Sequence, residues 1–569
     1  MRERSFQEIV QARLDASQGR LPCTLQLRNA NYLDVFSCEW KKGELSILDG
    51  VLVGVESGLK TTRATQVYDA SHQWIVPGFI DAHVHVESSM MTPRYFQKTV
   101  LNRGTTSAIC DPHELANVMG VQGIQYFLDS SMQLDMDLWV MLSSCVPSTH
   151  FETNGGGEIS AHHLVPLANH PRALGLAEMM NVPGVLNGDP EVLAKIQAFQ
   201  GRPIDGHCPL LRGQSLSAYA VAGISSCHES SELEEAREKL SKGIQVWIRE
   251  GSVAKDLKAL SSLLTLSTST SLGFCTDDRN PLDIALEGHL DYLIRKSIQF
   301  GVTPEVAYRC ASWSVARHYG LNSGLNRVGA IAPGYQADFV ILDDIEQCSI
   351  SSVLKKGRWE SEIDLPKEVS LQFGNSICTV VPEAADLEGP IGNVHVIGVL
   401  EGKIITEHRV KRSDALGVAK LSVLERYGKG SRPANGYVEG FGVYLKGAIA
   451  SSVGHDSHNL IVVGNQTADM KVALASIKEA GGGFCVVQEG RVLARLALPL
   501  GGLMSNQESS ELKKGLEKLR EASKSVGCIL KEPFLQLAFL SLPVIPSLKL
   551  TDRGLVDVDL FKIIDVRAS

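Results

Sequence analysis

The sequence has little of what marks secreted, membrane-spanning or nucleic-acid-binding proteins. No uninterrupted apolar run reaches the roughly 20 residues that a membrane helix needs, and the N-terminal stretch MRERSFQEIVQARLDASQGR has no apolar signal core. The 12 cysteines contain no CxxC pair, so reduced thiols in a cytoplasmic protein are expected. The net charge of −9 gives no basic surplus, which argues against nucleic acid as a partner.

What is present is a globular composition with a change of pattern along the chain. Of the 569 residues, 44% are hydrophobic and 21% are charged. Residues 1–76 predict a helix and then short strands separated by turns, the first part of a small β domain. Residues 77–327 alternate strands with helices, residues 328–379 return to strands, and residues 380–569 mix the two. The predicted class is α/β: a (β/α)8 barrel of TIM type, a β-sandwich domain built from segments before and after it, and a C-terminal α+β domain.

Eight candidate strands, separated by helical segments, lie within the predicted barrel, as this type of barrel requires. The expected strands are 78–82, 105–110, 138–142, 173–178, 203–206, 224–227, 244–248 and 272–276. Catalytic groups in such barrels sit at the carboxyl ends of the strands. The residues at and just beyond these ends are therefore the candidates for a site.

The first expected strand ends in His83 and His85. Because side chains alternate along a strand, both imidazoles point to the same face. Two imidazoles fixed on one face can hold a metal ion. The ordinary alternative is a strand with two hydrogen-bonded histidines, and a bare His-x-His recurs by chance.

Other residues that can bind metal follow at further strand ends. The fourth strand ends in Glu178, the fifth is followed by His207, the sixth by His228, and the eighth by Asp277 and Asp278. Each has an alternative role, since a lone histidine can support a ligand and an aspartate can begin a helix. Together, four histidines, a central carboxylate and a terminal aspartate suit a centre with two metal ions.

This order of residues resembles the amidohydrolase superfamily and, within it, the adenine deaminase family. The stretches that carry the resemblance cover nearly the whole chain: 77–90 (PGFIDAHVHVESSM), 111–118 (DPHELANV), 177–185 (AEMMNVPGV), 205–207 (DGH), 274–279 (FCTDDR), 329–334 (GAIAPG), 440–442 (GFG), 448–450 (AIA), 455–459 (HDSHN) and 542–546 (LPVIP). Glu178 is especially discriminating, because many superfamily relatives use a carboxylated lysine there. Cys227 departs from the pattern, which has Asp before the sixth-strand histidine, and we expect only a packing difference.

The resemblance implies hydrolytic deamination of adenine to hypoxanthine and ammonia by a metal-bound hydroxide, as in purine salvage. It implies two divalent metal ions, most simply Mn or Fe, with Zn also compatible. His83, His85 and Asp277 would hold one ion, and His207 and His228 the other, with Glu178 as the bridge. Asp277 would also move the proton from the hydroxide to the leaving amine, and its neighbour Asp278 is the other candidate.

The resemblance also directs attention to acids and hydroxyls near the first two strand ends. Glu87 and Ser88 leave the first strand; Asp111, His113, Glu114 and Asn117 leave the second. We expect Glu87 or Glu114 to contact the purine edge. The alternative is that Asp111-Pro112 forms a turn and Glu114 begins a helix.

For His455, Asp456 and His458 two interpretations remain: a turn network within the third domain, or a loop that reaches over the barrel mouth. Two other functions also stay open, a metal-dependent hydrolase of another cyclic amidine or amide, and a catalytically silent assembly scaffold. We expect a small-molecule substrate, no membrane partner, and a homo-oligomer (a dimer or larger).

Overall fold

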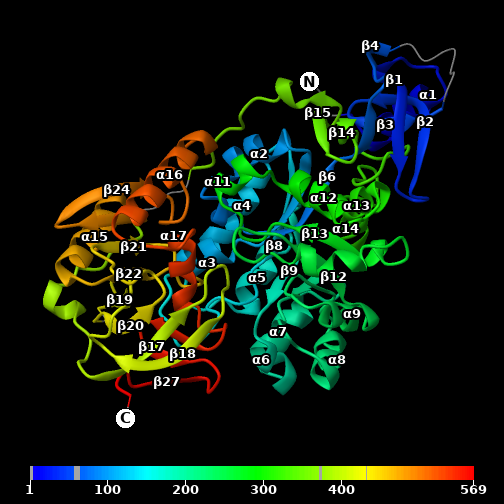
Figure 1. Cartoon of the computed structure of the whole chain (residues 1–569). Coiled ribbons are helices and arrows are strands. Elements are labelled where there is room, and N and C mark those ends of the chain that lie inside the picture. Colours follow the sequence, from blue (N-terminus) through cyan, green and yellow to red (C-terminus); the bar gives the residue numbers. More distant parts are fainter. Residues whose placement is uncertain (1–3, 57–63, 371–374, 431, 569) are drawn as a thin grey trace.

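The computed structural model describes residues 4–56, 64–370, 375–430 and 432–568. A central barrel is flanked by a small β domain, which contains the N-terminus, and by a C-terminal domain (Figure 1). The β domain consists of α1 (Phe6–Ser17), β1 (Cys23–Asp34), β2 (Glu39–Leu48), β3 (Val51–Gly54), β4 (Ala64–Asp69), β5 (Trp74–Pro77), β14 (Phe339–Asp344), β15 (Ser349–Lys355) and β16 (Arg358–Trp359).

The β domain is assembled from segments on both sides of the barrel. β5 pairs with β1 on one edge and with β14 on the other, where Val76 lies opposite Val340. This pairing makes the expected sandwich one continuous sheet in the order β16-β15-β14-β5-β1-β2-β3, with β4 beside β1. Its core is aliphatic and includes Leu27, Ile47 and Ile341, each fully buried.

The barrel contains the eight strands that the sequence predicts. They are β6 (Phe79–Val84), β7 (Thr105–Cys110), β8 (Asp137–Leu142), β9 (Ala173–Met179), β10 (Ile204–Gly206), β11 (Ser226–Cys227), β12 (Gln245–Arg249) and β13 (Leu272–Cys275). β6 to β10 pair in parallel, as do β11 to β13. Backbone hydrogen bonds from Ser225 to Ile204 (2.9 Å) and from Asp277 to His83 (3.1 Å) join the two sets. The strands therefore close into a ring whose carboxyl ends face one mouth.

Helices cover the outside of this ring, as parallel strands require. They are α2 (Pro93–Leu101), α3 (His113–Met119), α4 (Val121–Ser131), α5 (Ala161–Leu167), α6 (Val182–Asn187), α7 (Pro190–Ala198), α8 (Gly213–Val221), α9 (Leu233–Ser241), α10 (Leu257–Leu260), α11 (Pro281–Leu286), α12 (Leu290–Gln299), α13 (Pro304–Cys310) and α14 (Trp313–His318). A short 3-10 turn, η1 (Val86–Ser89), follows β6. The helix starts follow local chemistry; for example, Asp189 caps α7 by accepting hydrogen bonds from two backbone amides.

The C-terminal domain consists of an eight-stranded mixed sheet from β17 to β24, a separate three-stranded sheet of β25, β26 and β27, and helices packed on them. Its elements are β17 (Asn393–Val399), β18 (Thr406–Arg412), β19 (Val418–Leu424), β20 (Ala434–Glu439), β21 (Ala448–Ser451), β22 (Leu460–Gly464), α15 (Thr467–Ala480), β23 (Gly483–Gln488), β24 (Arg491–Ala497), α16 (Ser509–Ser525), α17 (Pro533–Ala538), η6 (Phe539–Ser541), β25 (Leu548–Thr551), β26 (Gly554–Asp557) and β27 (Lys562–Ile564). Leu512, Leu516 and Leu519 form the buried stripe of α16. Gly481 takes the left-handed conformation that ends α15.

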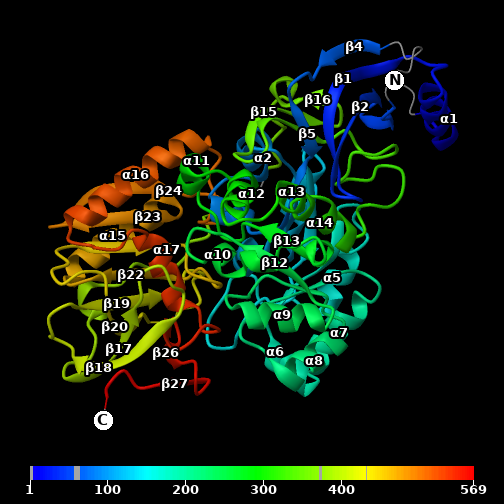
Figure 2. The same ribbon diagram turned by 45° about the vertical axis from the view of Figure 1, so that its right-hand side comes forward.

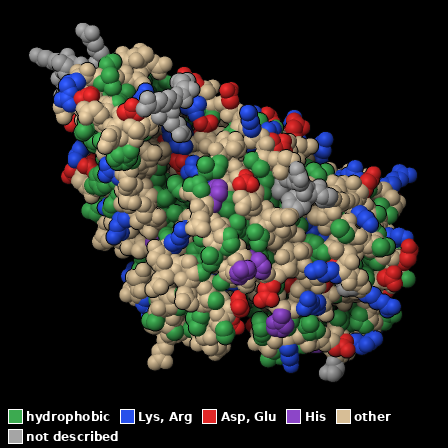
Figure 3. All heavy atoms as spheres, turned by 180° about the vertical axis from the view of Figure 1, so that it is seen from behind, with side chains coloured by type: hydrophobic (Ala, Val, Ile, Leu, Met, Phe, Trp, Pro, Cys, Tyr) green, Lys and Arg blue, Asp and Glu red, His purple; other side chains and the backbone are tan. Residues whose placement is uncertain are grey.

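The C-terminal domain lies against the barrel, and α17 is at the boundary between them in two views (Figures 1 and 2). On the far side of the molecule, acidic and basic side chains are interspersed (Figure 3). Within the described ranges, no helix has both the length and the apolar character needed to cross a membrane.

Candidate metal centre and active site

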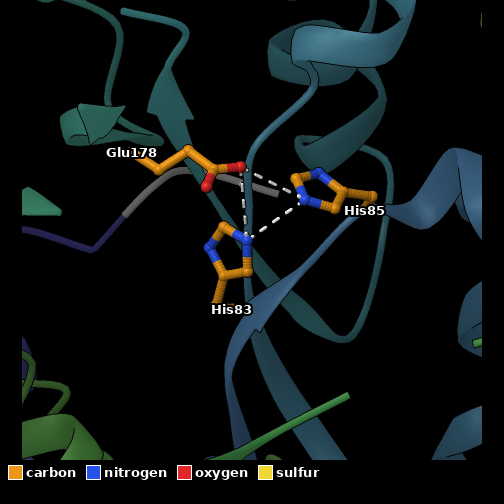
Figure 4. A group of neighbouring side chains, drawn as sticks. All are labelled: His83, His85 and Glu178. Carbon is orange, nitrogen blue, oxygen red and sulfur yellow. Dashed lines mark hydrogen bonds and ion pairs between the residues drawn. The ribbon is translucent and has the colours of Figure 1, made fainter. Parts of the chain in front are cut away.

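His83 of β6, His85 just beyond its end and Glu178 of β9 meet at the barrel mouth (Figure 4). The Nε2 atoms of His83 and His85 are 3.2 Å apart, as the alternation of side chains along one strand predicts. The Oε1 atom of Glu178 lies 3.7 Å from the first and 3.4 Å from the second. All three side chains are buried.

The second carboxylate oxygen of Glu178 faces two histidines from the next strands. Its Oε2 is 2.6 Å from His207 Nδ1 and 3.3 Å from His228 Nε2. The rings of His83 and His228 stack, with centroids 3.9 Å apart. One carboxylate thus lies between two pairs of histidines.

Asp277 completes the ring of candidate ligands from the end of β13. Its Oδ1 lies 3.1 Å from His85 Nε2 and 3.6 Å from His83 Nε2. Its Oδ2 accepts a hydrogen bond of 2.9 Å from Arg249. The backbone of Asp277 has φ +52°, a left-handed conformation that Asp and Asn tolerate better than most residues.

The electrostatics of this cluster follow from burial and from the single central carboxylate. Burial alone would raise the pKa of Glu178, but the charges of His207 and His228 hold it well below the usual range. In turn, burial disfavours the charged form of His228, yet Glu178 raises its pKa to about 9. Burial, reinforced by the charge of His228, holds the pKa of His83 well below the usual value.

The donor set fits metal ions. His83, His85 and Glu178 form one group whose ligand atoms lie within 4.8 Å of one another, and Glu178, His207 and His228 form another. His207 also has a buried Nε2 for which the described residues provide no hydrogen-bond partner. Imidazole nitrogen and carboxylate oxygen suit Zn, Fe and Mn. The arrangement is thus compatible with a metal site that Glu178 could bridge.

The residues predicted to touch substrate divide into two sets. His113 and Glu114 line the cavity at the barrel mouth, and His113 Nδ1 is 3.4 Å from Glu178 Oε1. Asp111, Asn117 and Glu87 are not among the residues that line this cavity.

Asp111, Asn117 and Glu87 instead hold the loop and helix after β7. Asp111 accepts from His113 Nδ1 (3.1 Å), and Asn117 donates to the carbonyl of His113 (3.1 Å). Glu87 accepts from the amide of Leu115 (3.0 Å). Their place beside the two cavity-lining residues thus follows from the sequence, whereas the direction of each side chain does not.

Ser88 contacts Asp278, which also forms a candidate metal-binding group with His85 and Asp277. The Ser88 hydroxyl donates to Asp278 Oδ1, and both residues line a second cavity next to the main one. Asp278 also lines the main cavity. Its burial and the charge of Asp277 raise its pKa, in contrast to Asp277, whose pKa is low because His85 and Arg249 outweigh the effect of burial.

The loop at 455–459 reaches the barrel mouth, the second of the two interpretations of these residues. His455 Nδ1 is 2.6 Å from Glu114 Oε1, and His458 Nε2 contacts Glu114 Oε2. Burial lowers the pKa of both rings, and the charge of Glu114 raises it. Glu114 outweighs burial at His455, whose pKa rises to about 9, whereas burial wins at His458, whose pKa falls to about 4. Asp456 lines the same cavity.

Two charged residues of the site were not among the predicted ones. Arg249, at the end of β12, pairs with Glu229 and with Asp277. Glu229 Oε1 is 3.7 Å from His228 Nε2 and 3.9 Å from His207 Nδ1. Arg249 and Glu229 both line the cavity. Their position at strand ends was the available signal, since each lies at or directly beyond a barrel strand.

The cavity at the barrel mouth has two unlike sides. The barrel supplies the histidines and carboxylates described above. The C-terminal domain supplies apolar side chains from two segments: Ile404, Phe539, Leu542, Val544 and Ile545. Cys227, the departure from the family pattern, faces away from this cavity, with its sulfur 3.6 Å from that of Cys208.

A parallel eight-stranded barrel whose strand ends gather histidines and acids around one buried glutamate has the design of a metal-dependent hydrolase. The amidohydrolase family model matches residues 74–360, and the model of the adenine deaminase C-terminal domain matches residues 400–562. A protein named adenine deaminase from Brucella suis biovar 1 (strain 1330) is 47% identical over 565 residues, which is 97% of this chain and 96% of that one. Another from Cereibacter sphaeroides (strain KD131 / KCTC 12085) is 48% identical over 565 residues, covering 97% and 98%.

The chain therefore belongs to the adenine deaminase family of amidohydrolases. A solved structure of N-acetyl-D-glucosamine-6-phosphate deacetylase from Mycobacterium smegmatis aligns with 59% of this chain and 99% of its own, at 16% identity and a TM-score of 0.44.

Proposed function

We propose that this protein is an enzyme that hydrolyses adenine to hypoxanthine and ammonia. The observation that carries the proposal is the position of Glu178 between two pairs of histidines, His83 with His85 and His207 with His228. The names of the full-length relatives supply the substrate.

The histidines, Glu178 and Asp277 are the proposed ligands of two divalent ions. His83, His85 and Asp277 would hold one ion, His207 and His228 the other, and Glu178 would contact both. Such ions, most simply Mn or Fe and alternatively Zn, supply Lewis acidity that makes water nucleophilic near neutral pH. Glu178 contributes the negative charge that two adjacent cations need in a buried site.

Asp277 is the proposed proton carrier. One of its oxygens faces the histidines and the other is held by Arg249, so the carboxylate is fixed while it accepts a proton from water and returns it to the departing amine. The pKa of Asp277 lies well below its usual range because the effects of His85 and Arg249 outweigh that of burial. The carboxylate is therefore ionised.

Glu114 and His113 are the proposed contacts to the purine edge. Both line the cavity and both are buried. Glu114 offers carboxylate oxygens to a ring N–H, and His113 offers its Nε2 while its Nδ1 is held by Asp111. Glu87, Asp111 and Asn117 would act through these residues, and Ser88 through Asp278.

Further properties follow as proposals from the composition and the structure. We infer a cytoplasmic location, since all 12 cysteines are free thiols. We also infer a role in purine salvage, which follows from the proposed substrate. We infer a homo-oligomer without nucleic-acid or membrane partners. We also propose the domain limits 1–76 with 328–379, 77–327 and 380–569, since β5 and β14 pair across the barrel insertion.

Release of ammonia from a panel of purines and cyclic amides tests the proposal. Protein loaded with Mn should release ammonia from adenine, forming hypoxanthine, faster than it releases ammonia from any other member of the panel. Turnover confined to another cyclic amidine or amide would refute the adenine assignment, and absence of all turnover in protein with less than one ion per chain would favour a silent scaffold.

A further inference from the structure

The apolar side of the main cavity comes from the C-terminal domain and is tightly held. We call Ile404, Phe539, Leu542, Val544 and Ile545 the apolar wall. Phe539, Leu542 and Ile545 pack with Val253, which belongs to the barrel loop after β12. The wall thus bridges from the C-terminal domain to the barrel.

A buried lysine joins the two segments that form this wall. Lys549 is fully buried in β25, and its Nζ donates to the carbonyls of Ile404 and Phe539, each at 2.9 Å. Thr406 adds a second connection, since its amide donates to the carbonyl of Pro546 at 3.0 Å. The wall is therefore held in place from behind by hydrogen bonds that do not involve the cavity.

The wall is also fixed to the polar side of the site. The ring of Phe539 stacks on that of His455, with centroids 4.7 Å apart and planes 10° apart. His455 in turn contacts Glu114 at 2.6 Å. A change in the position of the wall would move the residue proposed to bind the purine edge.

The chemistry of a purine base makes this wall relevant to specificity. Carbon 6 of adenine must reach the histidine and carboxylate cluster, and nitrogen 9 lies in the other ring, at the far end of the molecule. An apolar surface packs well against a flat ring, whereas it leaves sugar hydroxyls without hydrogen-bond partners. Contact between the wall and that far end would exclude substituents on nitrogen 9.

We propose that the apolar wall is the specificity-determining surface that restricts the enzyme to free heterocyclic bases and excludes bases substituted at nitrogen 9. This proposal rests on the proposed deamination of adenine. It assigns to the C-terminal domain a part of the substrate site, with Leu542 and Ile545 as the side chains that limit the length of the substrate.

Shortening the wall and comparing two substrates tests the proposal. In the Mn-loaded full-length protein, kcat/KM is measured for adenine and for 9-methyladenine with the wild type, Leu542→Ala and Ile545→Val. Leu535→Ala is the matched control, because Leu535 packs against the same apolar cluster and lines the second cavity, not the main one.

The wild type should strongly prefer adenine. In Leu542→Ala the ratio of kcat/KM for 9-methyladenine to that for adenine should rise about tenfold or more, as expected when an apolar pocket gains space for a methyl group. Ile545→Val should raise the ratio less, and Leu535→Ala should leave it unchanged. A ratio within about twofold of the wild type in both wall variants, with unchanged thermal unfolding, would overturn the proposal.

Binding separates failure of this proposal from failure of the proposed function. If the wild type released no ammonia from adenine, the deaminase assignment would fail, and the ratio of dissociation constants for the two bases would replace kcat/KM. A wall that limits substrate length should still change that ratio in Leu542→Ala and not in Leu535→Ala. An equal ratio in all variants would overturn the wall proposal on its own.

Discussion

Asp277→Asn should separate proton transfer from the other tasks of the site. The substitution removes one ionisable oxygen and keeps the shape of the side chain. Because Asn tolerates the left-handed backbone of Asp277 (φ +52°), the loop after β13 should keep its conformation, which alanine would not ensure. Arg249 loses an anionic partner but keeps its pair with Glu229, so the strand end should stay in place.

The expected magnitude follows from the role of Asp277 in the structure. A general acid–base group contributes about 10²- to 10⁴-fold, or about 2.7 to 5.4 kcal/mol of activation free energy. Asp277 also faces His85 at 3.1 Å, so a metal bond is lost as well if Asp277 is a ligand. We expect kcat for adenine to fall by at least about 10²-fold, with KM changed much less.

Steady-state ammonia release and metal analysis of the same preparation are the assay. Asp278→Asn is the comparison variant: Asp278 lines both cavities and accepts a hydrogen bond from Ser88, and as a supporting residue it should lower kcat by less than Asp277→Asn does, about 10- to 100-fold at most. If Asp278→Asn abolished turnover while Asp277→Asn was nearly silent, the proton would be assigned to the wrong neighbour.

Three further predictions address charge and stability. Glu178→Gln should lower metal content and activity together, because a neutral amide cannot balance two buried cations; normal values of both would make Glu178 a structural residue. Burial lowers the pKa of His455, but the charge of Glu114 outweighs burial and raises this pKa from the ordinary 6.5 to about 9. The pair therefore stabilises the fold fully below pH 6.5, and this stabilisation is lost as the pH rises through 9. His455→Gln should flatten that part of the pH dependence of Tm, and an unchanged profile would contradict the pairing. Lys355→Met removes a cation that lies 2.7 Å from both Asp137 and Asp338. Asp137 keeps Arg172 and Lys356, but Asp338 loses its ion-pair partner while buried, so the change should cost about 3–5 kcal/mol of unfolding free energy in urea titrations, whereas a loss below about 1 kcal/mol would refute this.

Much of the barrel could be predicted from the sequence because local pattern determines it. The segment 105–110 has no charged residue and forms β7 over the same residues, all of them buried, since a strand covered on both faces needs no charged, solvent-facing side. The alternation in β6 likewise places His83 and His85 together. The carboxyl ends of parallel strands meet at one mouth, which brings Glu178 and His207 to the same point.

What could not be predicted depends on contacts between distant segments or on side-chain direction. His455 lies 341 positions after Glu114 in the chain, and nothing local shows that they meet. Glu87 follows the first barrel strand, as a substrate-binding residue would, yet its carboxylate accepts from a backbone amide outside the cavity. The sequence shows Arg249 only as a charged residue at a strand end, because its pairs with Glu229 and Asp277 form only in the folded chain.

The most direct test of the central claim is the conversion of adenine by protein of known metal content. Protein purified after expression with Mn and an iron chelator is assayed for hypoxanthine and ammonia, and the same sample is stripped of metal and reloaded. We expect about two metal ions per chain and equal amounts of hypoxanthine and ammonia. Turnover should be lost when the metal is stripped and should return when it is reloaded. Adenine turnover that persists in metal-free protein, or no adenine turnover at full metal content, would contradict it.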